Sequence, residues 1–161
     1  MSEKLALLGG DPVRGVILPF VPEDADIDEE EIEAALEVLR SKKLSQLASA
    51  KVREFEEAFA KYYGVKHAIA VSSGTAALHV ALAAMGLGAG DGVILPPYTF
   101  MATANAILHQ NAVPVFADID PKTHNIDAES IREMATRKTK AVIPVHMLGH
   151  PADMDSILEA A

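Results

Sequence analysis

From residue 65 onward, short apolar segments of strand length alternate with segments of strong helix formers. The expected strands span residues 68–72, 92–96, 113–117 and 141–145, and the expected helices span residues 75–85, 99–110, 127–135 and 153–160. Strands that alternate with helices in this way form βαβ units. The sequence therefore predicts an α/β fold with a mostly parallel sheet.

Three polar turns follow the first three expected strands, at residues 72–75, 96–100 and 118–121. Right-handed crossovers place the carboxyl ends of parallel strands at one edge of the sheet. Ligands of open α/β sheets bind in the crevice at that edge. We therefore expect these three turns to lie beside a ligand site.

The turn Ser72-Ser73-Gly74-Thr75 joins an expected strand to an expected helix. The start of a helix has unpaired backbone N–H groups and a positive dipole end, so such a turn can hold a phosphate. Gly74 would let the backbone approach an anion closely, and the Thr75 hydroxyl would add a donor. In a simpler interpretation, Ser73 or Thr75 only caps the helix. The turn alone leaves both interpretations open, and it is neither GxGxxG nor a P-loop.

The first 64 residues have a different pattern. Residues 5–22 are expected to form an irregular arm, because glycine and proline interrupt them. Asp28 and Glu31 form a capping-box pattern at the start of a helix. A second apolar repeat at helical spacing ends at Gly64, a typical helix stop. We therefore predict an N-terminal arm with helices over residues 1–64 and a second domain over residues 65–161.

The formal net charge of −9 argues against nucleic acid or an anionic membrane as the main partner. Residues 23–37 hold nine acids and no base, a pattern typical of a solvated helix face. The chain has no cysteine, which excludes disulfides and thiolate chemistry and makes the cytoplasm the expected compartment. Its apolar runs are shorter than a membrane span, and its first residues lack the pattern of a signal peptide.

Several motifs follow one another along most of the chain: GGDPVR at 9–14, LSQ at 44–46, VREFE at 52–56, SSGTAALH at 72–79, GAGD at 88–91, PPYTFMATAN at 96–105, PVFADID at 114–120 and PVHMLGHPADMD at 144–155. In this order they resemble the pyridoxal-phosphate (PLP) dependent sugar aminotransferases of the DegT/DnrJ type. The GGDPVR motif resembles members that act on cyclitols and related rings.

The resemblance implies a fold-type-I large domain, a three-layer α/β/α structure in which residues 65–161 would contribute four of about seven strands. It implies that Gly74 and Thr75 bind the PLP phosphate and that the Phe100 ring stacks on the pyridine. Tyr98 and Thr99 would line the same rim. The residues alone would have favoured a core role for Phe100. The implied reaction moves an amino group from glutamate or glutamine to a nucleotide-linked keto-sugar or a keto-cyclitol, in a homodimer.

The sequence also departs from the family pattern. Gly92 replaces the usual acid after GAGD, and no glycine follows Gln46 in the loop that lies near the substrate in the family. The family's pyridine-binding aspartate and Schiff-base lysine have no counterpart here, so we assign no catalytic residue and expect no turnover by this chain alone. Two alternatives stay open: a fragment that only binds phosphate, PLP or a partner chain, and a PLP-dependent sugar dehydratase. A nicotinamide-binding domain is disfavoured, because GxGxxG is missing.

Histidine and aspartate residues give weaker signals. His146 follows the last expected strand and could lie near a cofactor, whereas His79 fits a packing role. The pair His146 and His150 is not expected to bind metal, because Gly149 and Pro151 interrupt the helix that this spacing requires. Asp118 and Asp120 fit turn chemistry at a strand end better than a catalytic carboxylate pair. The sequence thus predicts no metal site.

Overall fold

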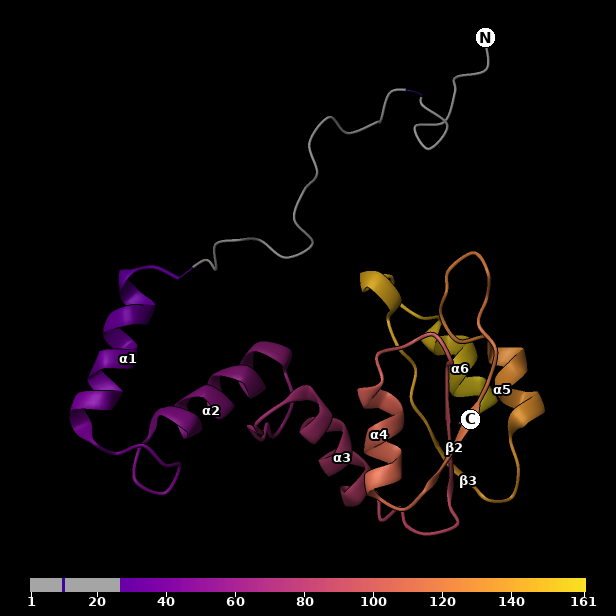
Figure 1. Cartoon of the computed structure of the whole chain (residues 1–161), viewed down its shortest axis with the longest axis horizontal. Helices are drawn as coiled ribbons and strands as arrows, with labels where there is room; N and C mark the ends of the chain where they lie inside the picture. Colours follow the sequence, from indigo (N-terminus) through magenta and orange to yellow (C-terminus); the bar gives the residue numbers. More distant parts are fainter. Residues whose placement is uncertain (1–9, 11–26) are drawn as a thin grey trace. The chain divides into compact units, whose positions relative to one another are not determined.

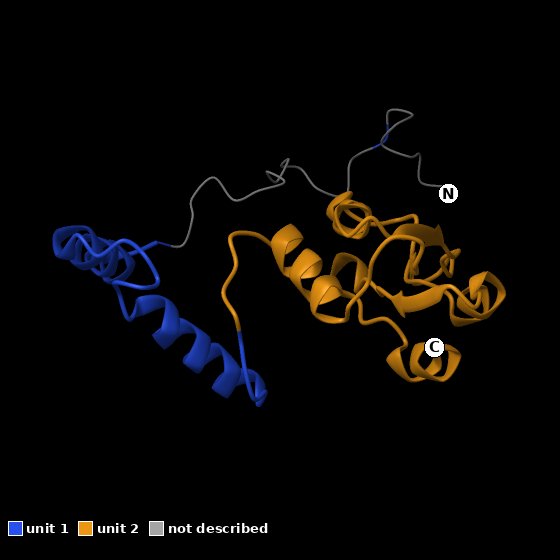
Figure 2. Ribbon diagram, turned by 90° about the horizontal axis from the view of Figure 1, so that it is seen from below, with its two compact units in different colours: residues 1–68 blue, residues 69–161 orange. Residues whose placement is uncertain are grey.

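The computed structural model describes Gly10 and residues 27–161. The irregular arm expected over residues 5–22 and the GGDPVR motif lie, except for Gly10, outside the described residues. The chain divides into two compact units, residues 1–68 and residues 69–161 (Figure 2). No helix among the described residues has the length and apolar character needed to cross a membrane.

The first unit contains two helices, α1 (Glu29–Ser41) and α2 (Lys51–Tyr63). The expected capping box starts α1: the Asp28 carboxylate accepts the backbone N–H of Glu30 at 2.9 Å, and the Glu31 carboxylate accepts the backbone N–H of Asp28 at 3.0 Å. Gly64 ends α2 with a left-handed φ of 66°, as predicted. The local rules for helix ends therefore hold at the start of α1 and at the end of α2.

Neither helix of the first unit buries a residue within the described structure. The aromatic side chains of α2 contact one another instead, with ring centroids 5.6 Å apart for Phe55 and Phe59 and 4.6 Å apart for Phe59 and Tyr63. The predicted helical spacing is thus confirmed. The aromatic side chains that share this spacing form an exposed row along α2 rather than a buried face.

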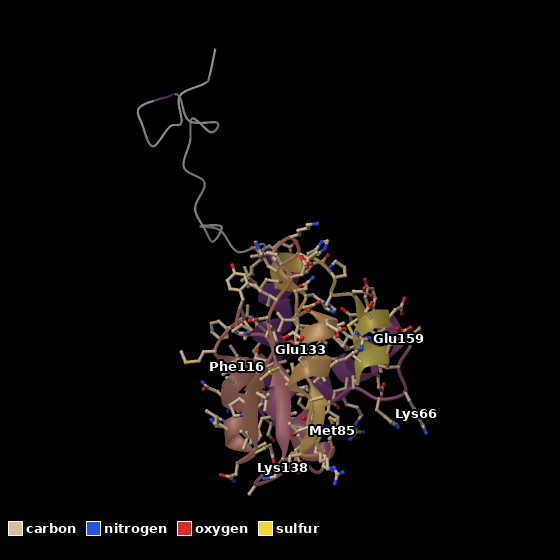
Figure 3. The ribbon with its side chains drawn as sticks, turned by 90° about the vertical axis from the view of Figure 1, so that its right-hand side faces the viewer. Lys66, Met85, Phe116, Glu133, Lys138 and Glu159 are labelled. Atoms are coloured by element: carbon tan, nitrogen blue, oxygen red, sulfur yellow. The ribbon has the colours of Figure 1, made fainter. Side chains whose placement is uncertain are left out.

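The second unit is built on a parallel sheet of β1 (Gly92–Leu95), β2 (Val113–Phe116) and β3 (Thr139–Val142), in the order β2-β1-β3. Val93 pairs with Pro114 of β2 and with Ala141 of β3, so β1 is the central strand. Figure 3 labels Phe116, at the end of β2, and Lys138, just before β3, toward opposite ends of the sheet.

The prediction of four strands is wrong for this chain, because residues 68–72 form no strand. An apolar run favours burial, but a strand also needs a neighbouring strand to complete its backbone hydrogen bonds. Among the described residues, no strand pairs with this segment.

Four helices follow as predicted: α3 (Gly74–Ala84), α4 (Ala102–His109), α5 (Ala128–Met134) and α6 (Met154–Ala160), with a short 3₁₀ helix, η2 (Met147–Gly149), before the last. The largest difference is at α4, which begins three residues after the expected start at Thr99. Residues 97–101 form a loop instead, and this loop contains Phe100.

Two apolar cores lie on opposite faces of the sheet. Val93 and Leu95 of β1 are fully buried against α3 and α4, whereas Ile94 is fully buried against α5 and α6. Because side chains alternate along a strand, β1 contributes to both cores. Figure 1 shows α3 and α4 on one side of the strands and α5 on the other. The predicted three-layer α/β/α fold is confirmed.

Candidate functional site

Three loops meet the carboxyl edge of the sheet: residues 96–101 before α4, residues 117–127 before α5 and residues 143–153 before α6. The chain leaves β1 toward α4 on one face, and it leaves β3 toward α6 on the opposite face. Neighbouring parallel strands with diverging connections define the crevice where α/β sheets bind ligands. The edge between β1 and β3 is therefore the candidate site.

The turn before α3 combines a cap with open backbone donors. The Ser73 hydroxyl oxygen accepts the backbone N–H of Ala76 at 3.1 Å, which satisfies one donor of the first turn. Gly74 and Thr75 are the first two residues of α3, and N–H groups at these positions have no acceptor within a helix. Ser73 is thus the cap, and the capping and phosphate interpretations are compatible.

Gly74 leaves free space at the start of α3. The residue is exposed, and a Cβ at this position would have no heavy atom within 4 Å beyond its own helix and chain neighbours. An anion can therefore approach the first backbone N–H groups of the helix, where the dipole favours negative charge. The chain's residues fit a phosphate group at this position.

Phe100 is not a core residue, since its side chain is 81% exposed in the loop between β1 and α4. The loop itself is ordered by hydrogen bonds. The Thr99 and Thr103 hydroxyls lie 2.8 Å apart, and the Phe100 carbonyl accepts the Thr103 backbone N–H at 3.0 Å. Tyr98 places its ring edge-on to His124, with centroids 5.8 Å apart. An ordered loop thus presents an unburied aromatic ring.

The predicted cofactor residues fall into two groups. Gly74 and Thr75 begin α3, whereas Phe100 precedes α4, and both helices pack in the same core. Among the described residues, no hydrogen bond or ring contact joins Phe100 to the turn. Tyr98 and Thr99 lie in the same loop as Phe100, directly before it in the sequence.

Asp120 serves turn geometry, as predicted. Its carboxylate accepts the backbone N–H groups of Lys122 at 2.7 Å and Thr123 at 2.9 Å. The hydrogen bonds from Thr123 and Lys122 lower the pKa of Asp120 from its ordinary value of 3.8. Asp118 is exposed, and within the described part of the chain no three histidine or acidic side chains group as metal ligands.

The histidines have different surroundings. His79 of α3 is partly buried and contacts His109 of α4 edge-on, with ring centroids 5.4 Å apart, in agreement with a packing role. His146 lies at the candidate edge, where its Nδ1 accepts the backbone N–H of Ala152 at 2.9 Å.

Asn125 is a structural residue of the site that the sequence did not indicate. Its side chain is 4% exposed and joins the loop after β2 to the loop after β3. Its Nδ2 donates to the carbonyls of His150 and Pro151 at 3.1 and 3.0 Å, and its Oδ1 accepts the backbone N–H of Met147 at 2.9 Å. Its position between Thr123 and Ile126 suggests only a turn, so local pattern could not reveal this role.

Comparison with known proteins identifies the family. Residues 25–161 match the DegT/DnrJ/EryC1/StrS aminotransferase family. The chain belongs to this family. It is 55% identical over 108 residues to GDP-perosamine synthase of Caulobacter vibrioides, covering 67% of this chain and 29% of that protein. It is 40% identical over 166 residues to L-glutamine:2-deoxy-scyllo-inosose aminotransferase of Streptomyces lividus, covering 100% of this chain and 38% of that protein.

Solved structures agree with the family assignment and with the fold-type-I architecture. An aminotransferase from Psychrobacter cryohalolentis superposes with a TM-score of 0.83 at 42% identity, covering 89% of this chain and 36% of that one. NtdA from Bacillus subtilis, solved with the cofactor PMP, gives a TM-score of 0.80 at 39% identity, covering 88% and 33%. Members of the DegT/DnrJ/EryC1/StrS family use pyridoxal phosphate. This chain spans about a third of the length of the relatives that it matches.

Proposed function

We propose that this chain forms the phosphate-binding and ring-stacking part of a PLP-dependent aminotransferase. The observation that carries the proposal is the start of α3, where Ser73 caps the helix and leaves the N–H groups of Gly74 and Thr75 open beside an exposed glycine. Membership of the aminotransferase family supports the same function.

In this proposal the backbone N–H groups of Gly74 and Thr75, with the Thr75 hydroxyl, hold the cofactor phosphate. The exposed Phe100 ring stacks on the pyridine, fixes its plane and excludes water from that side. When bound, PLP supplies the electron-accepting ring that amino-group transfer requires. The chain's own contribution is binding and orientation.

The proposed amino donor is glutamate or glutamine, and the proposed acceptor is a nucleotide-linked keto-sugar or a keto-cyclitol. Support comes from the relatives, whose names specify a GDP-sugar product in one case and L-glutamine with a scyllo-inosose in the other. We infer a homodimer from the family resemblance, and the cytoplasm as the compartment from the cysteine-free composition. A PLP-dependent sugar dehydratase remains the alternative reaction.

A second candidate function is cofactor or phosphate binding without turnover. Every lysine among the described residues is exposed, whereas a lysine that forms a Schiff base is activated by desolvation or by a neighbouring cation. This observation favours a chain that binds the cofactor but does not complete the reaction by itself. Addition of PLP followed by borohydride would separate the two functions, since only a linked lysine gives a site-specific reduced adduct.

Titration with pyridoxamine phosphate tests the proposed site, because this probe has no aldehyde to react with surface lysines. We expect it to bind more tightly than pyridoxamine, which lacks the phosphate. Gly74→Asp is the informative variant. An acid in the first turn favours the helix, yet its charge repels a phosphate. Loss of binding with an unchanged melting temperature would support the proposal, and equal affinity for both probes would contradict it.

A further inference from the structure

One ring nitrogen of His146 accepts a hydrogen bond from the protein backbone. The backbone N–H of Ala152 donates to its Nδ1 at 2.9 Å. An amide nitrogen can only donate, so Nδ1 must be the unprotonated nitrogen of the ring. The neutral imidazole then carries its hydrogen on Nε2. The fold thus selects one tautomer of an exposed histidine.

The loop around His146 is held by buried hydrogen bonds. Asn125 accepts the backbone N–H of Met147, the residue after His146, and donates to the carbonyls of His150 and Pro151. The carbonyl of His146 also accepts the backbone N–H of Gly149 at 3.1 Å. Both the backbone and the ring of His146 are therefore fixed before any ligand arrives.

His146 lies at the carboxyl edge of the paired strands β1 and β3, where the connections that follow them run to opposite faces of the sheet. The last backbone bond between these strands runs from the Ile143 N–H to the Ile94 carbonyl at 2.8 Å, and His146 follows three residues later. The residue is exposed, and no group in the described part of the chain accepts a hydrogen bond from Nε2. The Nε2–H of His146 is thus held in a fixed orientation beside the candidate crevice and is available to a ligand.

We propose that the His146 Nε2–H donates a hydrogen bond to an oxygen on the ring end of the ligand whose phosphate the start of α3 holds. This inference rests on the proposed function. The Phe100 loop follows β1 and the His146 loop follows β3, and these two strands are parallel neighbours, so both loops begin at the same edge of the sheet. A donor that is already oriented costs no reorganisation on binding.

Two substitutions separate the two ring nitrogens. In His146→Asn the side-chain oxygen can occupy the place of Nδ1 and keep the Ala152 bond, but the outer donor is lost. In His146→Gln the terminal amide can reach the place of Nε2 and keep the donor. His150→Asn is the matched control, because His150 lies on the same loop and only its backbone is used by Asn125.

The probes are pyridoxamine phosphate and inorganic phosphate, each titrated against the whole chain. We expect His146→Asn to weaken pyridoxamine phosphate binding by roughly 3- to 10-fold, the usual effect of losing one hydrogen bond. Phosphate affinity should stay unchanged, and His146→Gln should recover most of the loss. Unchanged binding of pyridoxamine phosphate to His146→Asn, or an equal loss for both probes, would overturn the inference while the proposed function stands.

Nitrogen-15 NMR of the histidine rings gives an independent readout. In the neutral ring of His146 we expect a protonated Nε2 and an unprotonated Nδ1, and the opposite tautomer would overturn the inference. If the expected tautomer is found but the wild-type chain binds neither probe, the proposed function fails, and the ligand assigned to His146 fails with it.

Discussion

The Ser73 hydroxyl accepts the backbone N–H of Ala76 at 3.1 Å and so caps α3 from outside the helix. The cap satisfies the backbone N–H of Ala76 but leaves the backbone N–H groups of Gly74 and Thr75 without a hydrogen bond to it. A single turn can therefore stabilise the helix and still offer N–H groups to an anion. The cap therefore does not exclude phosphate binding, although the sequence presents the two roles as alternatives.

Ser73→Ala should destabilise the second unit by about 1 kcal/mol, because it removes the cap. Thermal or urea unfolding measures this loss. Ser73→Asn keeps a capping oxygen and is the control, with an expected change of only a few tenths of a kcal/mol. Equal stability of wild type and Ser73→Ala would show that the hydrogen bond contributes nothing to folding.

Helix starts are largely predictable from the sequence because their hydrogen bonds are local. Asp127 and Asp153 each accept a backbone N–H from three residues ahead, as their positions before helical segments indicate. Strand formation depends on distant residues instead. The segment 68–72 has an apolar strand pattern but no pairing strand among the described residues, so its sequence alone misleads.

The candidate site was predictable where it follows from chain order and unpredictable where it follows from packing. The position of Gly74 and Thr75 at a helix start follows from the sequence. The exposure of Phe100 does not follow from the spacing of the residues around it, which fits a continuous helix; the later start of α4 at Ala102 leaves the ring exposed. Asn125 bonds to residues 22 to 26 positions away, beyond any local pattern.

Phe100→Ala should weaken pyridoxamine phosphate binding and leave stability almost unchanged. The ring is 81% exposed, so its removal should change the free energy of unfolding by less than about 0.5 kcal/mol. Loss of an aromatic stacking contact worth about 0.5–1.5 kcal/mol corresponds to a roughly 2- to 12-fold weaker affinity. Fluorescence titration measures the affinity.

Met101→Ala is the matched control for Phe100→Ala, since Met101 is the next residue and is 70% exposed. Its removal should not affect the affinity for pyridoxamine phosphate. A similar loss in both variants would indicate a general change in the loop and would argue against stacking by Phe100.

The lowered pKa of Asp120 predicts a pH-dependent contribution to stability. Its ionised carboxylate accepts the N–H groups of Thr123 and Lys122, so the folded state favours the charged form. For a pKa lowered on folding, the stabilisation is present above the ordinary value of 3.8 and is lost as the pH falls through the folded pKa. Stability should therefore decline in acid.

Asp120→Asn tests this contribution, because the amide keeps the shape of the side chain without its charge. The melting temperature of wild type should exceed that of the variant near neutral pH, and the difference should vanish well below pH 3.8. Asp118→Asn, at an exposed position of the same loop, is the control. A difference that does not depend on pH would exclude the proposed electrostatic cause.

Asn125→Ala should loosen the loop that carries His146. The substitution leaves the Met147 N–H and the carbonyls of His150 and Pro151 without their side-chain partner. Each buried polar group that loses its partner costs about 1–3 kcal/mol, and partial access of water to the loop reduces the sum, so we expect a destabilisation of about 2–4 kcal/mol. Urea unfolding measures the total effect.

Hydrogen exchange at the Met147 amide gives the local effect of the same substitution. Exchange should accelerate in Asn125→Ala, because the amide loses its acceptor, and pyridoxamine phosphate binding should weaken because the His146 ring is no longer held in place. Thr123→Ala is the control, since the Thr123 hydroxyl accepts only the backbone N–H of Asn125, at 3.3 Å, and the substitution leaves the Asn125 side chain in place. If Met147 exchanges at the wild-type rate while the global stability falls, Asn125 supports the fold without ordering the His146 loop. Weaker binding of pyridoxamine phosphate together with faster exchange at Met147 would instead show that the Asn125 side chain supports ligand binding at the edge between β1 and β3.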